Sequence, residues 1–173
     1  MIVDSIKAEY LRYKKLGEGA IGQVQEDGIN KVIGEDNNSI SVIVYHISGN
    51  FKSRFTDFLT ADGEKVWRKR DTEFTERKVT REELIGKWTE GWNILTRTLA
   101  TLSDEDLNKI VTIRGKKLTV IEALHRSLAH ITYHVGQIVF IARTLVGKDW
   151  KSLSIPRGGS EEYNKNPILE KSN

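Results

Sequence analysis

The sequence predicts an all-α protein: a four-helix bundle with a long crossover between the second and third helices and a small β-hairpin before the fourth. Three observations favour this fold class. Four long segments place apolar residues at steps of three and four, the repeat of an amphipathic helix. Capping signals precede three of these segments, at Ser39, Thr80 and Thr119. Strand-forming residues gather in one short stretch around Gly115.

The first two helices are separated by a polar loop. The first helix is expected from Ile2 to about Gln25, and its glycines weaken its intrinsic propensity, so tertiary packing must hold it. A loop rich in Gly, Asp and Asn follows over Gly28–Asn38. Ser39 then caps a second helix that reaches about Leu59. The apolar row of this second helix contains Ile43, Ile47, Phe51, Phe55 and Phe58.

A long polar connection, Thr60–Val79, leads to the third helix and contains a turn at Asp62-Gly63. A crossover of this length lets two successive helices of a bundle run in the same direction. The third helix opens with the capping box Thr80–Glu83. Trp88 and Trp92 belong to its apolar row, and we expect both to be core residues.

A short helical turn at Ser103–Asp106 precedes the predicted hairpin. The hairpin strands are Val111–Ile113 and Leu118–Val120, with Gly115 in the turn between them.

The fourth helix is expected over Val120–Val146, opened by the capping box Thr119–Glu122 and ended by Gly147. Residues 151–173 contain two prolines and two adjacent glycines and are expected to form an extended C-terminal tail on the surface. Because no repeat or composition break divides the chain, we expect residues 1–173 to form a single domain.

Composition excludes several classes of protein. The chain has no cysteine, so it offers neither disulfides nor thiolate ligands, which fits a reducing compartment. Charged residues within Met1–Tyr10 exclude the apolar core of a signal peptide. The most apolar stretch, Val135–Val146, is too short to span a bilayer. We therefore expect a soluble cytoplasmic protein without a membrane partner.

The charge pattern gives little reason to expect a nucleic-acid partner. The formal net charge is +3 and the two signs are interleaved along the chain. The basic, aromatic stretch Trp67–Arg70 is the best candidate for a nucleic-acid patch. Acidic residues on both sides of it cancel its field, so we expect no binding of nucleic acid.

The strongest functional signal is a pair of histidines on the fourth helix. His130 and His134 are one turn apart, so both rings lie on one face at the edge of the apolar row. His46 occupies the same kind of boundary on the second helix, whereas His125 points away from the pair. Three imidazoles with one open position are typical of a catalytic divalent-metal site. With no sulfur ligand, zinc or nickel is the expected ion. The alternative is an ordinary hydrogen-bonded histidine pair near the core.

Polar residues near these histidines are candidates for contacts with a ligand histidine or with substrate. Asn50 and Asp57 follow His46 along one row of the second helix, and Gln137 lies three residues beyond His134. No glutamate follows His130, so the pair is not the motif of zinc metalloproteases. A bound metal can still activate water or hold a thiolate. Since the chain has no cysteine, any thiol chemistry needs a thiol cosubstrate.

The sequence resembles the DinB/YfiT-like superfamily of metal-dependent proteins, four-helix bundles with a histidine on the second helix and His-x-x-x-His on the fourth. The segments that carry the resemblance extend over nearly the whole chain. They are Asn38-Ser39, His46–Asn50, Ser53–Leu59, Asp62–Lys65, Arg114-Gly115, His130–His134, Gly136–Ile138 and Leu153–Gly158.

The resemblance implies that His46, His130 and His134 are the three metal ligands and that the protein forms a homodimer. Related members transfer low-molecular-weight thiols such as bacillithiol or mycothiol to electrophiles, or use such a thiol to isomerise maleylpyruvate; others are described as hydrolases. We therefore expect a metal-dependent enzyme, a thiol S-transferase or a hydrolase, that acts on a small molecule. The alternative is a noncatalytic stress-response or interaction module with a structural metal.

Overall fold

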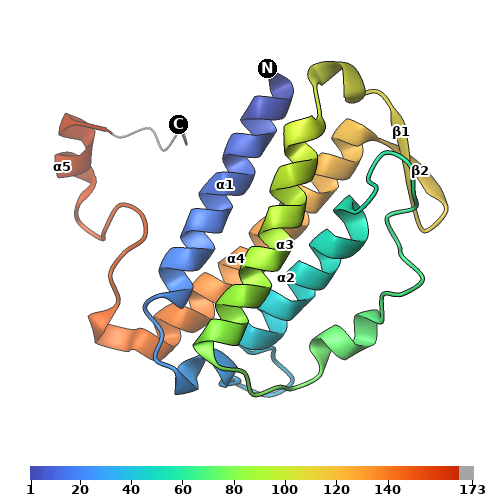
Figure 1. Cartoon of the computed structure of the whole chain (residues 1–173). Helices are drawn as coiled ribbons and strands as arrows, with labels where there is room; N and C mark the ends of the chain where they lie inside the picture. The colour runs from blue at the N-terminus through green and yellow to red at the C-terminus, as the bar shows by residue number, and fades with distance from the viewer. Residues whose placement is uncertain (168–173) are drawn as a thin grey trace.

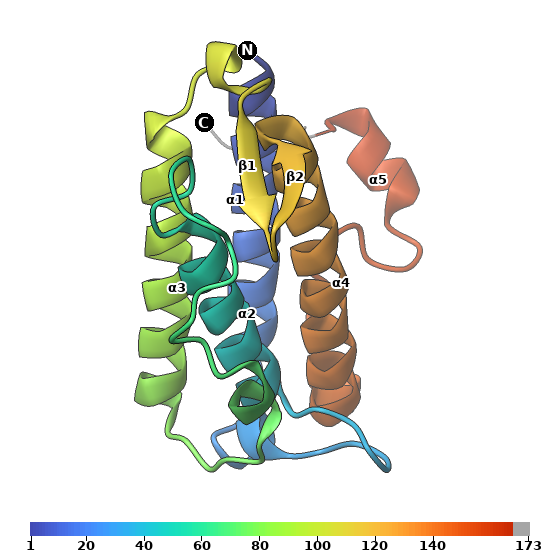
Figure 2. The ribbon, with the colours of Figure 1, turned by 90° about the vertical axis from the view of Figure 1, so that its right-hand side faces the viewer.

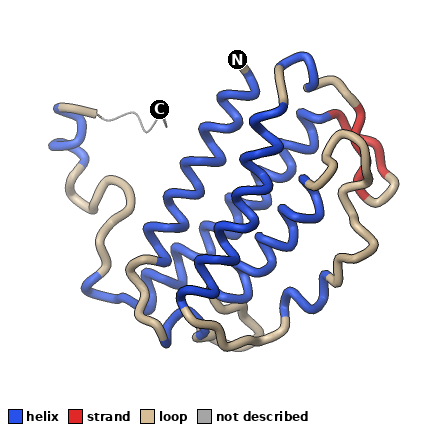
Figure 3. The backbone as a smooth tube through the Cα atoms, in the orientation of Figure 1, coloured by secondary structure: helices blue, strands red, loops and turns tan. Residues whose placement is uncertain are grey.

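The computed structural model describes residues 1–167, which form five α-helices and one two-stranded antiparallel sheet (Figures 1 and 3). The helices are α1 (Ile2–Ile21), α2 (Ile40–Phe55), α3 (Arg81–Thr101), α4 (Val120–Val146) and α5 (Ser160–Lys165). Short 3₁₀ segments are η1 (Asp27–Asn30), η2 (Arg70–Phe74), η3 (Asp104–Asp106) and η4 (Gly147–Asp149). The strands are β1 (Ile110–Ile113) and β2 (Lys116–Thr119). The predictions of a helical protein and of a small hairpin are confirmed.

The four long helices lie side by side, with α2 packed mainly against α3 and α1 against α4. The segment between α2 and α3 returns along the length of the helices, so α2 and α3 run in the same direction, opposite to α1 and α4 (Figure 2). None of the helices in residues 1–167 has both the length and the apolar character that a membrane crossing requires.

Large aromatic side chains fill the centre of the core, as the sequence predicted for the two tryptophans. Trp88 and Trp92 are buried, and Trp92 meets the ring of Phe51 edge to face at a centroid distance of 5.0 Å. The buried Tyr10 hydroxyl donates a hydrogen bond to the carbonyl oxygen of Leu124 at 3.0 Å, which connects α1 to α4. Each aromatic residue thus buries a large apolar area between helices that are distant in sequence.

The helix starts agree with the capping signals. Ser39 Oγ accepts a hydrogen bond from the backbone N–H of Val42 at 3.3 Å. Thr80 and Thr119 each form a complete capping box, with reciprocal bonds to Glu83 and Glu122. These contacts involve residues three apart in the chain, which is why the sequence alone reveals them.

The C-terminal ends predicted for two helices lie beyond the ends found in the structure. α1 ends at Ile21 rather than Gln25, because the chain turns at Gly22 and Arg81 donates hydrogen bonds to the carbonyl oxygens of Ile21 and Val24. α2 ends at Phe55 rather than Leu59, and two residues later Asp57 adopts a left-handed conformation with φ 50°. The apolar residues beyond both ends still reach the core, which is what made the helical periodicity look longer.

The carboxylate of Asp62 is one of the groups that attach the crossover to the hairpin. Asp62 accepts hydrogen bonds from the backbone N–H groups of Glu64, Arg114 and Gly115 at 2.7, 2.9 and 2.8 Å. These bonds lower the pKa of Asp62 to about 2. Arg114 and Gly115 both have positive φ, of 54° and 68°, in the turn between β1 and β2. Asp62 therefore holds a turn whose N–H groups would otherwise point into solvent.

The prediction of an extended tail over residues 151–173 is only partly correct. α5 interrupts it with one and a half turns of helix at Ser160–Lys165, and residues 168–173 lie outside the described part of the chain. The start of the tail lies against the C-terminal end of α1, where Gln23, just beyond the helix, donates to the carbonyl oxygen of Lys151 and accepts from its N–H, at 3.0 and 2.8 Å. Leu153 packs against the core beside Gly19.

Two glycines on α3 provide a matched test of the α2–α3 packing. A Cβ at Gly91 would lie 2.8 Å from the Cα of Ser48, whereas a Cβ at the exposed Gly86 would meet nothing within 4 Å. We expect Gly86→Ala to raise the free energy of unfolding by up to ~1 kcal/mol, the gain in helix propensity. Gly91→Ala should lower it, because backbone must move. Urea unfolding of both variants checks this, and equal effects would contradict the close approach of α2 and α3.

Candidate metal centre

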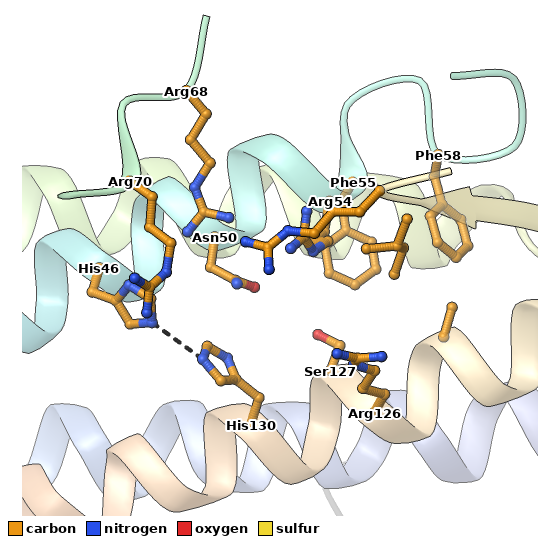
Figure 4. Close-up of a pocket in the computed structure, with 13 residues that line it drawn as sticks. His46, Asn50, Arg54, Phe55, Phe58, Arg68, Arg70, Arg126, Ser127 and His130 are labelled. Atoms are coloured by element: carbon orange, nitrogen blue, oxygen red, sulfur yellow. Dashed lines mark hydrogen bonds between the residues drawn. The ribbon is translucent and has the colours of Figure 1, made fainter. Parts of the chain in front are cut away.

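Three histidines from two facing helices meet at one point. His46 lies on α2, and His130 and His134 lie on α4. The Nε2 atom of His130 is 3.1 Å from the Nε2 of His46 (Figure 4) and 3.1 Å from the Nε2 of His134. One ring nitrogen of each residue lies within 4.8 Å of the others, so the group can hold a metal ion. His46 and His134 are buried and His130 is half-buried.

The spacing of these nitrogens fits a divalent ion with tetrahedral coordination. A Zn–N distance of ~2.0–2.1 Å places two ligand nitrogens roughly 3.3–3.4 Å apart, close to the 3.1 Å found for two of the pairs. Within residues 1–167, the group comprises three side chains and includes no carboxylate. A closed structural zinc site has four protein ligands, so this donor set leaves a coordination position open.

Hydrogen bonds on the far side of two rings orient them. Nδ1 of His46 is 2.8 Å from Oε2 of Glu73, and a carboxylate can only accept, so the Nδ1–H donates. Nδ1 of His134 likewise donates to Oε1 of Gln137 at 2.8 Å, while Nε2 of Gln137 donates to the Tyr133 hydroxyl at 3.1 Å. In a neutral ring with its proton on Nδ1, Nε2 carries a lone pair. Both lone pairs point at the common centre.

The third ring cannot satisfy both neighbours. His130 Nε2 lies between the lone pairs of His46 and His134, and it carries at most one hydrogen. At least one contact therefore brings two lone pairs together, which is unfavourable in a buried place. A cation at the centre would accept all three lone pairs. The arrangement thus fits a bound metal better than a hydrogen-bonded cluster.

The environment keeps two of the histidines neutral. Burial, reinforced by the charges of His134 and His46, lowers the pKa of His130 to about 3. Burial also lowers the pKa of His134 to about 4; the hydrogen bond that His134 donates to Gln137 opposes this decrease, and the charge of His46 adds to it. Since neutral imidazole is the metal-binding form, protons compete weakly for these two ligands near neutral pH.

Glu73 is the main residue that the sequence analysis missed. It comes from η2 in the crossover, and Arg68 holds it through two hydrogen bonds of 2.8 Å. The Arg68 and Glu73 side chains are only 3% and 11% exposed. The ring of Phe74 packs against His46 at a centroid distance of 4.6 Å. In the sequence, Glu73 is one of the acidic residues beside Trp67–Arg70 that cancel the field of this basic stretch, and nothing there connects it to His46.

The sequence contains one local sign that another segment packs closely against α2 near His46. Gly49 lies on α2, one turn after His46, and a Cβ there would come within 2.8 Å of Cδ of Glu73. A glycine inside a predicted helix signals a close approach by another part of the chain. It does not say which part approaches, so Glu73 could not have been named from it.

A cavity of about 240 Å³ adjoins the histidines between α2 and α4 (Figure 4). Its lining residues are His46, Asn50, Arg54, Phe55, Phe58, Arg68, Arg70, Ile113, Arg114, Ala123, Arg126, Ser127 and His130. Two of the three histidines therefore face space that a small molecule can enter.

The other sequence candidates have different positions. Asn50 is buried in the cavity wall, and Gln137 contacts His134 rather than the cavity. Asp57 is exposed beyond the end of α2, because the helix stops before the polar row reaches it. His125 is exposed, as expected from its place on the helical wheel.

Comparison with known proteins gives one match. The model of a family described as "Protein of unknown function (DUF1572)" matches residues 1–159. No curated protein and no solved structure matches the chain. The matched region contains the three histidines, Glu73 and all the residues that line the cavity. The chain therefore belongs to the DUF1572 family, whose function is unknown.

Proposed function

We propose that this protein is a metal-dependent enzyme in which His46, His130 and His134 bind a divalent ion, zinc or nickel, beside a pocket for a small-molecule substrate. The observation that carries the proposal is the convergence of three imidazole Nε2 atoms, with His46 and His130 in the wall of a cavity. The resemblance to DinB/YfiT-like proteins supports the same ligand set. It also supports a four-helix bundle, a single domain and a homodimer as parts of the proposal.

The chain's own residues position the ligands and shape the reaction space. Glu73 and Gln137 hold the rings of His46 and His134 with Nε2 toward the centre. The buried surroundings limit the access of bulk water, and Asn50 presents a side-chain amide to the cavity. When bound, a divalent ion supplies Lewis acidity that lowers the pKa of water or of a thiol. Since the chain has no cysteine, a thiol comes from a cosubstrate.

These properties favour a thiol S-transferase or a hydrolase over a noncatalytic module with a structural metal. Three protein ligands and an adjoining cavity support catalysis, because a purely structural site gains most from four protein ligands and a closed shell. The experiment below distinguishes the two, because a noncatalytic module would bind metal without turning over a substrate.

The first prediction concerns metal binding. We expect purified protein to bind about one zinc or nickel ion per chain through His46, His130 and His134, because these donors converge. His130→Ala should weaken binding by more than the ~10–100-fold caused by losing an outer partner of a ligand. Saturation at ~100 times the Kd should raise the free energy of unfolding by ~2.7 kcal/mol. Elemental analysis and urea unfolding measure these effects.

His125→Ala is the matched control, because His125 is exposed on the same helix. It should leave metal content and stability unchanged. Assays of thiol transfer to a model electrophile and of ester or amide hydrolysis should show activity in the metal-loaded protein that His130→Ala abolishes. Metal binding without turnover would support the noncatalytic module, and retention of metal by His130→Ala would refute the ligand set.

The second prediction concerns Glu73. Glu73→Gln removes the negative charge that holds the His46 ring, and the expected result is a ~10–100-fold loss of metal affinity. The free energy of unfolding should also fall, because the buried Arg68 loses its counter-charge. Competition against a chelator of known affinity measures the change. Glu76→Gln, an exposed position with the same change of charge, should keep full affinity. If both variants bind metal equally well, Glu73 has no role in orienting His46.

The third prediction concerns pH. The pKa values of His130 and His134 are about 3 and 4 in the folded chain, whereas both groups titrate near ~6.5 when unfolded. Between these values the unfolded chain binds more protons, so stabilisation present above about pH 6.5 is lost as the pH falls. Urea unfolding with a chelator at about pH 7 and pH 5 should show this loss. His130→Ala should reduce this loss of stability. An unchanged loss would contradict its assignment to the protonation of His130.

A further inference from the structure

The cavity beside the histidines is lined by many positive charges. Arginines reach it from four different elements: Arg54 from α2, Arg68 and Arg70 from the crossover and Arg126 from α4 (Figure 4), and Arg114 from the hairpin turn. Among the lining residues, all of which belong to the described part of the chain, there is no aspartate or glutamate. A cationic ligand would be repelled by such walls.

One carboxylate is shared by two of these arginines. Oε2 of Glu64 accepts hydrogen bonds from Nη1 and Nη2 of Arg54, each at 3.1 Å, and from Nε of Arg114 at 2.8 Å. Burial lowers the pKa of Arg54, and the charges of Arg68 and Arg114 lower it further against the opposing effect of Glu64. Because two guanidinium groups share this one carboxylate, Glu64 neutralises this side of the cavity only in part.

The remaining arginines add further unbalanced charge. Arg70 has Asp71 at 3.8 Å, but that carboxylate is fully exposed and is screened by water. Arg126 is exposed, and within residues 1–167 its guanidinium has no ion pair or hydrogen bond. Since Arg68 is paired with Glu73, three carboxylates face five arginines, which leaves two excess positive charges around the cavity.

The positions of these charges connect them to the histidines. Arg126 is one turn before His130 on the same face of α4, and Arg54 is two turns after His46 on α2. One helical turn is ~5.4 Å along the axis. A small molecule held between Arg54 and Arg126 would therefore lie in the same cavity as His46 and His130, one to two helical turns from them.

We propose that this cavity binds the carboxylate or phosphate group of a small anionic substrate and that Arg126, with Arg54 and Arg70, holds that group. The inference rests on the proposed function, because it assigns the cavity to the substrate of the metal centre. Guanidinium groups match carboxylate and phosphate oxygens with paired hydrogen bonds. A partly enclosed cavity lined by one sign of charge also raises the local concentration of anions. The volume of about 240 Å³ limits the ligand to a small molecule.

The test is titration calorimetry with two probes, inorganic phosphate and malonate, on metal-free and on zinc-loaded protein. Arg126→Gln should weaken binding of the preferred anion about tenfold in both forms, since a charge-assisted contact is lost. The matched control is Arg143→Gln, an exposed arginine on the same helix, about 25 Å further along the axis. It should bind as the wild type does. The tighter probe identifies the group as phosphate or carboxylate.

The outcomes test the anion site and the metal centre separately. If neither anion binds, or if Arg126→Gln and Arg143→Gln bind equally, the anion site is refuted, while zinc content measured on the same samples leaves the metal centre standing. Binding that occurs only with zinc and is insensitive to Arg126→Gln would mean that the anion contacts the metal alone, which also refutes the proposal. Anion binding without any zinc binding would refute the metal centre, and with it the cavity's assignment to that centre's substrate.

Discussion

The hydrogen bond between His46 and Glu73 is the interaction on which the candidate site depends. It joins α2 to the crossover and directs Nε2 of His46 toward the two histidines of α4. Glu73 also pairs with Arg68, whose side chain is almost wholly buried. Without Glu73, Arg68 would be a buried charge without a partner, which is strongly destabilising. The crossover therefore belongs to the site and is not only a connection between helices.

The two facing helices divide the site into a neutral end and a cationic end. At one end three imidazoles present lone pairs to a common point, and the charges of Arg68 and Arg54 help to keep His130 unprotonated. At the other end two excess guanidinium charges surround the cavity. A divalent ion would add to this positive charge. An anionic ligand between the two ends would offset both positive charges, so the proposed metal centre and the proposed anion site favour the same kind of ligand.

Local patterns predicted much of the fold and the histidine set. The pair His130 and His134 is defined by the four-residue repeat of a helix, and the predicted bounds of α4 agree with the structure. The tryptophans of α3 were identified as core residues from the same periodicity. The end of α2 was predicted too late because apolar residues beyond it still pack inward, and for that reason Asp57 was wrongly placed on the polar row. Periodicity reports which residues are buried, not where the helical hydrogen bonds stop.

The sequence by itself determined the helical class, the capped helix starts, the hairpin and the three histidines, since all of these follow from residue types at fixed short spacings. Only the tertiary structure decided that Glu73 orients His46 across 27 positions and that five arginines from four elements surround one cavity. The reason is physical. Helical periodicity fixes the relative directions of neighbouring side chains, whereas the path of an irregular crossover is set by the contacts it makes with distant helices, and no local spacing records those contacts.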